Sequence, residues 1–254
     1  MKIYNVGIIG TGQIAGSIDD DRKRKSVWSH AGAYKLCTRT KIVAACDIDH
    51  ERLESFGKSW KVGRLYRDYR DMLKSEEIDI VSICAPTKTH YEILKNVAGC
   101  GIKAIFCEKP LAFSYKQCSQ AVDICRKNNV LLAVNYFRRW DNLYLKIKEI
   151  IDSKQFGTIK TMVSYSNTAL YMNASHMIDL MLMLGGRISK VYGKMDSSFV
   201  RKVHGLEDPG GIFHFTTESG MEELLYAAGD SQLKHQFEID LQFTNGRIRS
   251  SCYG

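Results

Sequence analysis

The sequence lacks the features that mark membrane, secreted and low-complexity proteins. No apolar run approaches the roughly 18 residues of a membrane-spanning helix. The N-terminal residues do not follow the layout of a signal peptide, because a glycine turn interrupts their apolar stretch. Only three prolines occur, and there is no proline-rich linker or low-complexity tract. We therefore expect a cytoplasmic globular protein with no membrane partner.

Paired cysteine spacing is also missing. Eight cysteines are present, but none forms a C-x-x-C pair, which is the spacing that a zinc site requires. Several of them end apolar runs, as Cys46 and Cys84 do. We therefore predict no metal site, and we interpret the cysteines as small core side chains in a reducing compartment.

The charge pattern does not favour nucleic acid. A formal net charge of +8 suits nucleic acid, an anionic surface or an anionic small molecule. The densest basic cluster, residues 22–25, directly follows three aspartates at 19–21, so opposite charges offset each other there. Basic and aromatic residues are not interleaved as they are on nucleic-acid platforms. We expect no nucleic-acid partner.

The first half of the chain shows a repeated strand–helix pattern. Its 254 residues, 44% of them hydrophobic, suffice for two domains. Short, nearly all-apolar segments alternate with helical patterns, which is typical of parallel strands buried on both faces. We expect helices at 91–97 and 115–127, and strands at 3–9, 41–46, 78–84, 103–107 and 130–134.

The pattern changes after residue 136. Strands now follow one another through turns, which predicts an α+β domain with a mainly antiparallel, open sheet. We expect helices at 143–151 and 176–184, and strands at 158–165, 190–195, 211–217 and 237–243. The sequence therefore predicts an α/β protein with two domains, residues 1–136 and 137–254.

A glycine turn follows the first predicted strand and is expected to open a helix. Gly10 permits a tight turn, Gly12 lets the backbone approach a pyrophosphate, and Ala15 allows close helix–strand packing. The helix N-terminus would offer free N–H groups to the phosphates. A glycine turn at an ordinary strand–helix junction is the alternative. We predict a doubly wound Rossmann domain that binds a dinucleotide through Gly10, Thr11, Gly12, Gln13 and Ile14.

Asp47 follows the second predicted strand, the position of the acid that binds the adenine ribose. A carboxylate there accepts hydrogen bonds from both ribose hydroxyls and repels a 2′-phosphate, which favours NAD over NADP. The separation between Gly12 and Asp47 exceeds the usual spacing of about 20 residues, so we expect a loop or extended helix through 19–30. Asp47 as a simple turn former is the alternative.

Two more strand ends carry polar motifs. Residues 84–92 read Cys-Ala-Pro-Thr-Lys-Thr-His-Tyr-Glu, and residues 107–111 read Cys-Glu-Lys-Pro-Leu. With the glycine turn, these motifs resemble the glucose-fructose oxidoreductase, inositol dehydrogenase and MocA family, for which Glu-Lys-Pro is the most specific element. The resemblance extends over the chain, since residues 134–139 and 176–180 are similar to its second-domain segments. Members that act on nucleotide-linked sugars in polysaccharide and lipopolysaccharide assembly are the most similar.

The resemblance implies two catalytic residues. Lys109 would hydrogen-bond the reacting oxygen, stabilise alkoxide charge and shuttle a proton. His176 would assist, because imidazole titrates near neutral pH. A surface lysine and a hydrogen-bonded core histidine are the respective alternatives. Many members have an aspartate four residues before this histidine; Met172 stands there and cannot relay a proton, so catalysis rests more heavily on Lys109.

The same resemblance implies further binding residues. The strand-end motifs agree with it, because ligands of open α/β sheets bind at the carboxyl ends of the strands. Trp28 and His30 belong to a segment that would line the substrate mouth, unless Trp28 only packs in a loop. His90 is equally explained as a capping or loop histidine, and Arg138 as a solvated arginine. The expected cofactor contacts are Ala85, Pro86, Thr87, His90, Glu108 and Lys109, and the expected substrate contacts are Lys109, Tyr136, Arg138, Asn173 and His176.

The resemblance implies an NAD-dependent oxidoreductase that transfers a hydride between nicotinamide and a hydroxyl or keto group of a sugar or nucleotide sugar. It also implies a homo-oligomer formed through the C-terminal sheet. Two alternatives stay open: a catalytically silent NAD-binding regulator or sensor, and an NAD-dependent glycoside hydrolase. The chain ends at Gly254, earlier than the family's second domain, so we interpret it as a fragment, a truncated form or a short variant.

Overall fold

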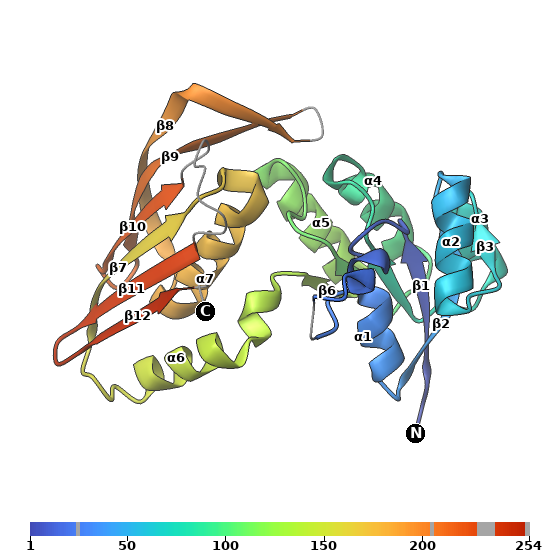
Figure 1. The fold of residues 1–254 in the computed structure, drawn as a ribbon, viewed down its shortest axis with the longest axis horizontal. Coiled ribbons are helices and arrows are strands. Elements are labelled where there is room, and N and C mark those ends of the chain that lie inside the picture. Colours follow the sequence, from blue (N-terminus) through green and yellow to red (C-terminus); the bar gives the residue numbers. More distant parts are fainter. Residues whose placement is uncertain (24–25, 204–205, 228–236, 252–254) are drawn as a thin grey trace. The chain divides into compact units, whose positions relative to one another are not determined.

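The computed structural model of the protein describes residues 1–23, 26–203, 206–227 and 237–251. The chain divides into two compact units, Met1–Asn135 and Tyr136–Gly254. Each unit contains one six-stranded sheet (Figure 1). Among the described residues, no helix combines the length and apolar character needed to span a membrane.

The sheet of the first unit is wholly parallel, with the order β3-β2-β1-β4-β5-β6. This is the strand order of the doubly wound dinucleotide-binding fold, so the predicted Rossmann sheet is confirmed. All five expected strands are present. The sixth strand, β3, was not expected, because its two residues are too few to give a periodic signal. The strands are β1 (Tyr4–Ile9), β2 (Thr40–Cys46), β3 (Leu65–Tyr66), β4 (Ile80–Ile83), β5 (Ala104–Cys107) and β6 (Leu131–Val134).

Side-chain caps and apolar faces explain the helices of this unit. Asp49, Asp68 and Ser114 each accept a hydrogen bond from a backbone N–H of the helix that follows, which satisfies a donor that the helix leaves free. Leu94 and Val97 bury one face of α4, and full burial of such a side chain contributes roughly 1.5–3 kcal/mol. The helices are α1 (His30–Leu36), α2 (His50–Trp60), α3 (Tyr69–Ser75), α4 (Thr87–Ala98) and α5 (Tyr115–Lys127).

The chain after the glycine turn differs from our expectation. A helix was expected to begin directly after Gly12, and this is wrong. A single turn follows instead, closed by the Gly16 N–H, which donates to the Gly12 carbonyl at 3.3 Å. A 3-10 helix, Ser17–Asp20, comes next, and α1 begins only at His30.

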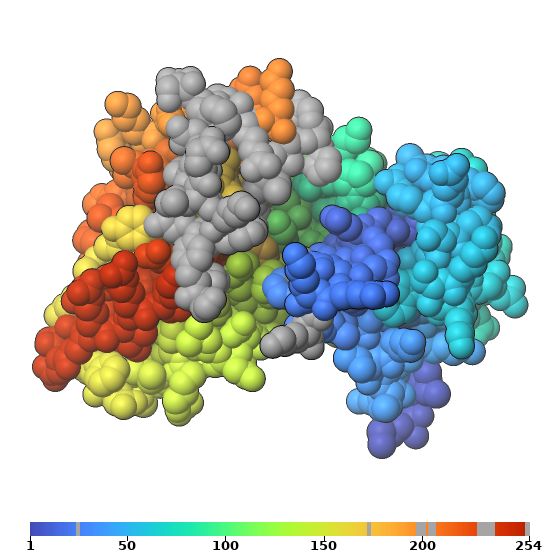
Figure 2. Space-filling model, viewed as in Figure 1, coloured from blue at the N-terminus to red at the C-terminus, as the bar shows by residue number. Residues whose placement is uncertain are grey.

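This turn and α1 nevertheless form one hydrogen-bonded stack. The first two N–H groups of α1 donate to the carbonyls of Ile14 and Ala15, at 3.1 and 2.9 Å. Residues 16–29 therefore interrupt the helix after its first turn, and residues 17–23 and 26–28 are exposed or partly exposed on the surface of the unit (Figure 2). The interruption accounts for the long spacing between Gly12 and Asp47.

The second unit contains a sheet with the order β12-β11-β7-β10-β9-β8. Its strand pairs are antiparallel except for β10 with β7, so the predicted mainly antiparallel sheet is confirmed. Strands β10 and β12 were not expected, and β8 and β9 are longer than expected. The strands are β7 (Ile159–Ser166), β8 (Ile188–Val203), β9 (Leu206–Thr217), β10 (Glu222–Ala227), β11 (Phe237–Phe243) and β12 (Arg247–Ser251).

One face of this sheet is covered by α7 (Ser175–Gly185), and α6 (Asn142–Asp152) packs beside that helix (Figure 1). A 3-10 helix, Phe137–Trp140, precedes α6, and a π-helix, Leu170–Ala174, leads into α7. The covered face holds an apolar core in which α7 meets β7, β10 and β11. Its fully buried members include Met162, Met177, Leu180, Met181, Leu225, Ile239 and Leu241.

Candidate functional site

The two glycines of the turn after β1 have different structural roles. Gly10 has a φ of +89°, and a Cβ there would lie 2.6 Å from the backbone N of Ala85. Both the backbone angle and the approach of β4 therefore require glycine at this position. At Gly12 a Cβ would meet nothing within 4 Å. The fold does not need glycine at that position, and the space over it is open to a ligand.

Asp47, directly after β2, fastens the end of that strand to the glycine turn. Its Oδ2 accepts hydrogen bonds from the Thr11 N–H at 2.7 Å and the Thr11 hydroxyl at 3.0 Å. Its Oδ1 accepts from the Asp49 N–H at 2.9 Å, with the Arg52 guanidinium 3.8 Å away. A carboxylate has about four acceptor positions, so these three hydrogen bonds leave about one for a ribose hydroxyl. The arrangement presents a preorganised acid at the expected place.

The end of β4 adjoins this turn. Ala85 touches the space of Gly10, Pro86 precedes α4, and Thr87 is the first residue of that helix. Glycine turn, Asp47 and the Ala85–Thr87 segment are therefore brought together at the carboxyl edge of the sheet, as expected.

His90 differs from its expected position. It does not open α4 and is not a loop histidine: it lies one turn into the helix and is buried. Its Nε2 is 2.7 Å from the Ala85 carbonyl and its Nδ1 is 3.0 Å from the Pro110 carbonyl. Burial lowers the pKa of His90, although these carbonyls favour the charged ring. The contacts favour a role in holding two backbone segments together rather than in touching the cofactor.

Glu108, directly after β5, is buried, and both of its carboxyl oxygens have hydrogen-bond partners. Its Oε1 accepts a hydrogen bond from the Asn135 amide at 2.6 Å and lies 2.9 Å from His30 Nε2, and its Oε2 accepts from the Lys109 N–H at 3.2 Å. Burial acts to raise the pKa of Glu108, but the hydrogen bonds from His30 and Asn135 together outweigh it, so the pKa is lowered. The Lys109–Pro110 peptide bond that follows is cis.

The partners of Glu108 were not predicted from the sequence. His30 was considered only as part of a segment at the substrate mouth, and Asn135 only as part of a family-like stretch. The sequence gives one weak signal for each residue. His30 is a polar residue at the first position of an apolar helix, and Asn135 is a polar residue directly after an apolar strand. Neither signal indicates that both side chains meet the same carboxylate.

In the second unit, His176 is the second residue of α7 and is buried against two aromatic rings. Its ring centroid lies 5.4 Å from that of Tyr136 and 5.1 Å from that of Phe137, both in edge orientation. The structure thus brings together Tyr136 and His176, two of the expected substrate contacts. Met172 and Asn173 belong to the preceding π-helix, and their side chains lie outside the described part of the structure.

The two neighbouring arginines of this unit are in different environments. The Nε of Arg139 lies 2.9 and 2.8 Å from the two carboxylate oxygens of Asp179, so its charge is matched. The guanidinium of Arg138 lies over the rings of Phe137 and Phe237, at 4.8 and 3.9 Å from their centroids. Among the described carboxylates, none forms an ion pair with Arg138, in contrast to Arg139.

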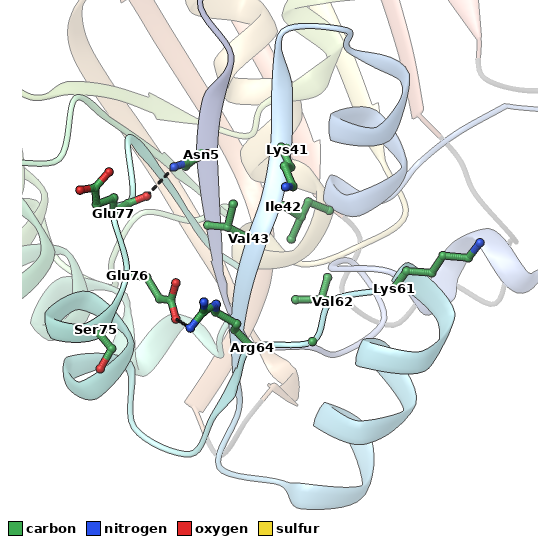
Figure 3. Close-up of a pocket in the computed structure, with 11 residues that line it drawn as sticks. Asn5, Lys41, Ile42, Val43, Lys61, Val62, Arg64, Ser75, Glu76 and Glu77 are labelled. Carbon is green, nitrogen blue, oxygen red and sulfur yellow. Dashed lines mark hydrogen bonds and ion pairs between the residues drawn. The ribbon is translucent and has the colours of Figure 1, made fainter.

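A hollow of about 450 Å³ in the first unit lies away from these residues (Figure 3). It is bordered by Asn5 near the start of β1 and crossed by the ion pair of Arg64 with Glu76, at 3.2 Å. Because Gly10 follows the other end of β1, this hollow is at the opposite edge of the sheet. It is not part of the dinucleotide site.

Residues 4–136 match the family described as "Oxidoreductase family, NAD-binding Rossmann fold", the glucose-fructose oxidoreductase, inositol dehydrogenase and MocA family. The chain belongs to this family. The predicted family, its oxidoreductase class and NAD as its cofactor are thereby confirmed. The turn of this chain fits that cofactor, because it combines open space over Gly12 with a fixed acid, Asp47, beside it.

Relatives are similar over most of the chain. The uncharacterized oxidoreductase YrbE of Bacillus subtilis (strain 168) is 32% identical over 203 residues, 74% of this chain and 56% of that protein. The inositol 2-dehydrogenase of Salmonella typhimurium (strain LT2) is 27% identical over 256 residues, 94% of this chain and 71% of that protein. The chain thus spans little more than half the length of YrbE.

Solved structures share the fold at low identity. The WlbA dehydrogenase from Bordetella pertussis, in complex with NADH and UDP-GlcNAcA, has a TM-score of 0.83 at 20% identity, covering 98% of this chain and 78% of that one. The scyllo-inositol dehydrogenase from Lactobacillus casei, with NAD(H) and scyllo-inositol, has a TM-score of 0.79 at 22% identity, covering 99% and 77%.

Proposed function

We propose that the protein is an NAD-dependent dehydrogenase that oxidises a hydroxyl group of a sugar or nucleotide sugar, or reduces the corresponding ketone. The observation that carries the proposal is the convergence of the glycine turn, Asp47 and the Glu108–Pro110 segment at one edge of the parallel sheet. Inositol 2-dehydrogenase and the complex of WlbA with UDP-GlcNAcA support this class of substrate.

The first unit binds and orients the cofactor. The turn at Gly12 receives the pyrophosphate, and Asp47 accepts a hydrogen bond from the adenine ribose and disfavours a 2′-phosphate. Ala85, Pro86 and Thr87 border the same site. NAD, when bound, supplies the acceptor or donor of the hydride.

Lys109 handles the proton that accompanies hydride transfer. We assign it as the group that hydrogen-bonds the reacting oxygen, takes its proton during oxidation and returns one during reduction. His176 is assigned as an assisting group, with Tyr136, Arg138 and Asn173 as substrate contacts. The position of Arg138 over two aromatic rings supports recognition of a hydroxyl or anionic group by its remaining N–H donors.

A homo-oligomer formed through the second sheet completes the proposal. The face opposite α7 exposes a contiguous set of large apolar side chains, with Tyr192 77% exposed and Tyr226 opposite Ile212 in neighbouring strands. Such a patch is typical of a protein interface. Its members are Tyr165, Tyr192, Ile212, Leu224 and Tyr226, which the strand registers place on one face.

The substitution Lys109→Ala tests the catalytic assignment. NADH formation is followed with UDP-GlcNAcA, scyllo-inositol and myo-inositol as candidate substrates, and binding of NADH is measured by calorimetry. We expect turnover to fall by about 10²–10⁴-fold, the usual contribution of a general acid or base, with NADH binding retained. Near wild-type turnover would show that Lys109 does not have this role.

The same assay distinguishes the alternatives. Net NADH formation supports the dehydrogenase. Cleavage of a glycoside without net NADH supports the hydrolase, and NADH binding without chemistry on any candidate supports the regulator.

A further inference from the structure

A chain of hydrogen bonds runs through the interior of the first unit and ends at Glu108. The Tyr34 hydroxyl lies 2.8 Å from Ser82 Oγ, and Ser82 Oγ lies 3.0 Å from His30 Nδ1. His30 Nε2 lies 2.9 Å from Glu108 Oε1. Ser82 and His30 are buried, and the His30 ring also packs against the ring of Phe106 at 4.7 Å.

One proton of this chain can be assigned. A carboxylate only accepts hydrogen bonds, so His30 Nε2 carries a proton and donates a hydrogen bond to Glu108. Burial raises the pKa of Tyr34 to about 12, so its hydroxyl stays protonated. The Ser82 hydroxyl lies between Tyr34 and His30 Nδ1, within hydrogen-bond distance of both. Every donor in the chain has an acceptor, which makes the arrangement specific and rigid.

His30 also connects two segments that are far apart in the sequence. Its backbone N–H donates to the Ile14 carbonyl, in the turn that follows Gly12, at 3.1 Å. Its side chain holds Glu108, whose other oxygen accepts from the Lys109 N–H. His30 therefore joins the pyrophosphate turn to the lysine segment within the same unit.

We propose that His30 is a positioning residue that aligns Lys109 with the nicotinamide end of the cofactor by holding Glu108. This inference rests on the proposed function, in which Lys109 faces the reacting groups. His90 supports it, since its Nδ1 lies 3.0 Å from the Pro110 carbonyl and so contacts the segment on the other side of Lys109. Both neighbours of Lys109 are thus held, and the imidazole of His30 connects Glu108 to the helix that continues the glycine turn.

Two substitutions at His30 separate positioning from simple packing. His30→Gln places an amide N–H near the original Nε2 and can still donate to Glu108. His30→Asn places its amide near the original Nδ1 and cannot reach Glu108. The readout is the rate at which acetic anhydride labels Lys109, with and without NADH, quantified by peptide mass spectrometry. Dissociation constants for NADH and thermal melting are measured for each variant.

In the wild type, NADH is expected to slow labelling of Lys109. His30→Asn is expected to lose most of this protection, with the dissociation constant for NADH within about threefold of the wild type because no cofactor contact is removed. His30→Gln is expected to keep the protection of Lys109 by NADH. Where a candidate substrate is turned over, the rate should fall about 10- to 100-fold in His30→Asn, the cost of a small misplacement.

Full protection of Lys109 in His30→Asn would overturn this inference alone. If His30→Gln lost as much of the protection as His30→Asn, this inference would also be overturned, because the hydrogen-bond donor to Glu108 would then be irrelevant. An absence of protection in the wild type would overturn both this inference and the role of Lys109 in the proposed function. If His30→Asn does not fold, Glu108→Gln serves in its place. The donors of His30 and Asn135 hold its one carbonyl oxygen, so its NH2 group faces the Lys109 N–H and that hydrogen bond is lost. Retained protection in this variant overturns the inference.

Discussion

Glu108 and Glu223 are buried glutamates, one in each unit, and their surroundings are opposite. Glu108 is 8% exposed and is held by His30, Asn135 and the Lys109 N–H. Glu223, on β10, is 0% exposed, and neither carboxyl oxygen has a hydrogen-bond partner among the described residues. Burial raises the pKa of Glu223 to about 7. Burial acts in the same direction on Glu108, but the hydrogen-bond partners of Glu108 outweigh it and lower its pKa.

The difference shows how the two units use buried polar groups. In the first unit they form a complete network that ends beside Lys109, where a defined geometry serves the proposed chemistry. In the second unit Glu223 lies in an apolar sheet face, against Gly185 at the end of α7, where no side chain fits next to the carboxyl group. A buried acid without partners weakens a fold, and a buried acid with all partners specifies one.

The largest effect expected from this comparison is that of Glu108→Ala. Removing the carboxylate leaves the donors of His30 and Asn135 buried without an acceptor, and each unsatisfied buried donor costs about 1–3 kcal/mol. Chemical denaturation, followed by hydrogen exchange of β5 peptides, measures the loss in the first unit. A cost below about 1 kcal/mol would show that the network adds little stability.

The two acids also make the units respond to pH in opposite directions. The pKa of Glu223 rises from 4.5 to about 7 on folding, so the folded state binds more protons between these values. The second unit should therefore lose about 3 kcal/mol as the pH rises from 4.5 to 7. In the first unit the pKa of Glu108 is lowered on folding. Its contribution to the free energy of unfolding is therefore present above the usual pKa of a glutamate and is lost as the pH falls through the lowered value.

Hydrogen exchange of β10 and β5 peptides over this pH range measures the two responses separately. Glu223→Gln should remove the fall in β10 protection, because the amide carries no charge at any pH. An unchanged pH dependence in this variant would show that Glu223 is not its source.

The smallest stability effect is expected for Gly12→Ala, which is compared with Gly10→Ala in the same turn. Gly10→Ala meets both the positive φ and the backbone of Ala85, so it should cost about 2–4 kcal/mol. Gly12→Ala should change stability by less than about 0.5 kcal/mol, because no protein atom lies near its Cβ, yet it should weaken NADH binding at least about tenfold. Calorimetry and denaturation of the matched pair measure both quantities, and equal losses of stability would contradict the distinction.

Local patterns were enough to predict the architecture and the cofactor. Apolar runs at strand length predicted five of the six parallel strands. The glycines and Asp47 predicted a dinucleotide site from a few consecutive residues, and Glu108–Pro110 added to it through the family resemblance. Strand β3 was not predicted because its two residues have no period, and β10 was not predicted because it starts with two charged residues, Glu222 and Glu223.

Only the tertiary structure decided how the site is held together. The interruption at 16–29 hides the continuity between the glycine turn and α1, because that continuity consists of backbone hydrogen bonds across the interrupting segment. His30 and Glu108 are 78 positions apart in the chain, and their contact depends on the start of α1 lying beside Ser82 of β4 and Phe106 of β5. A sequence pattern records the period of one element, whereas a buried hydrogen bond between two elements depends on how both are placed.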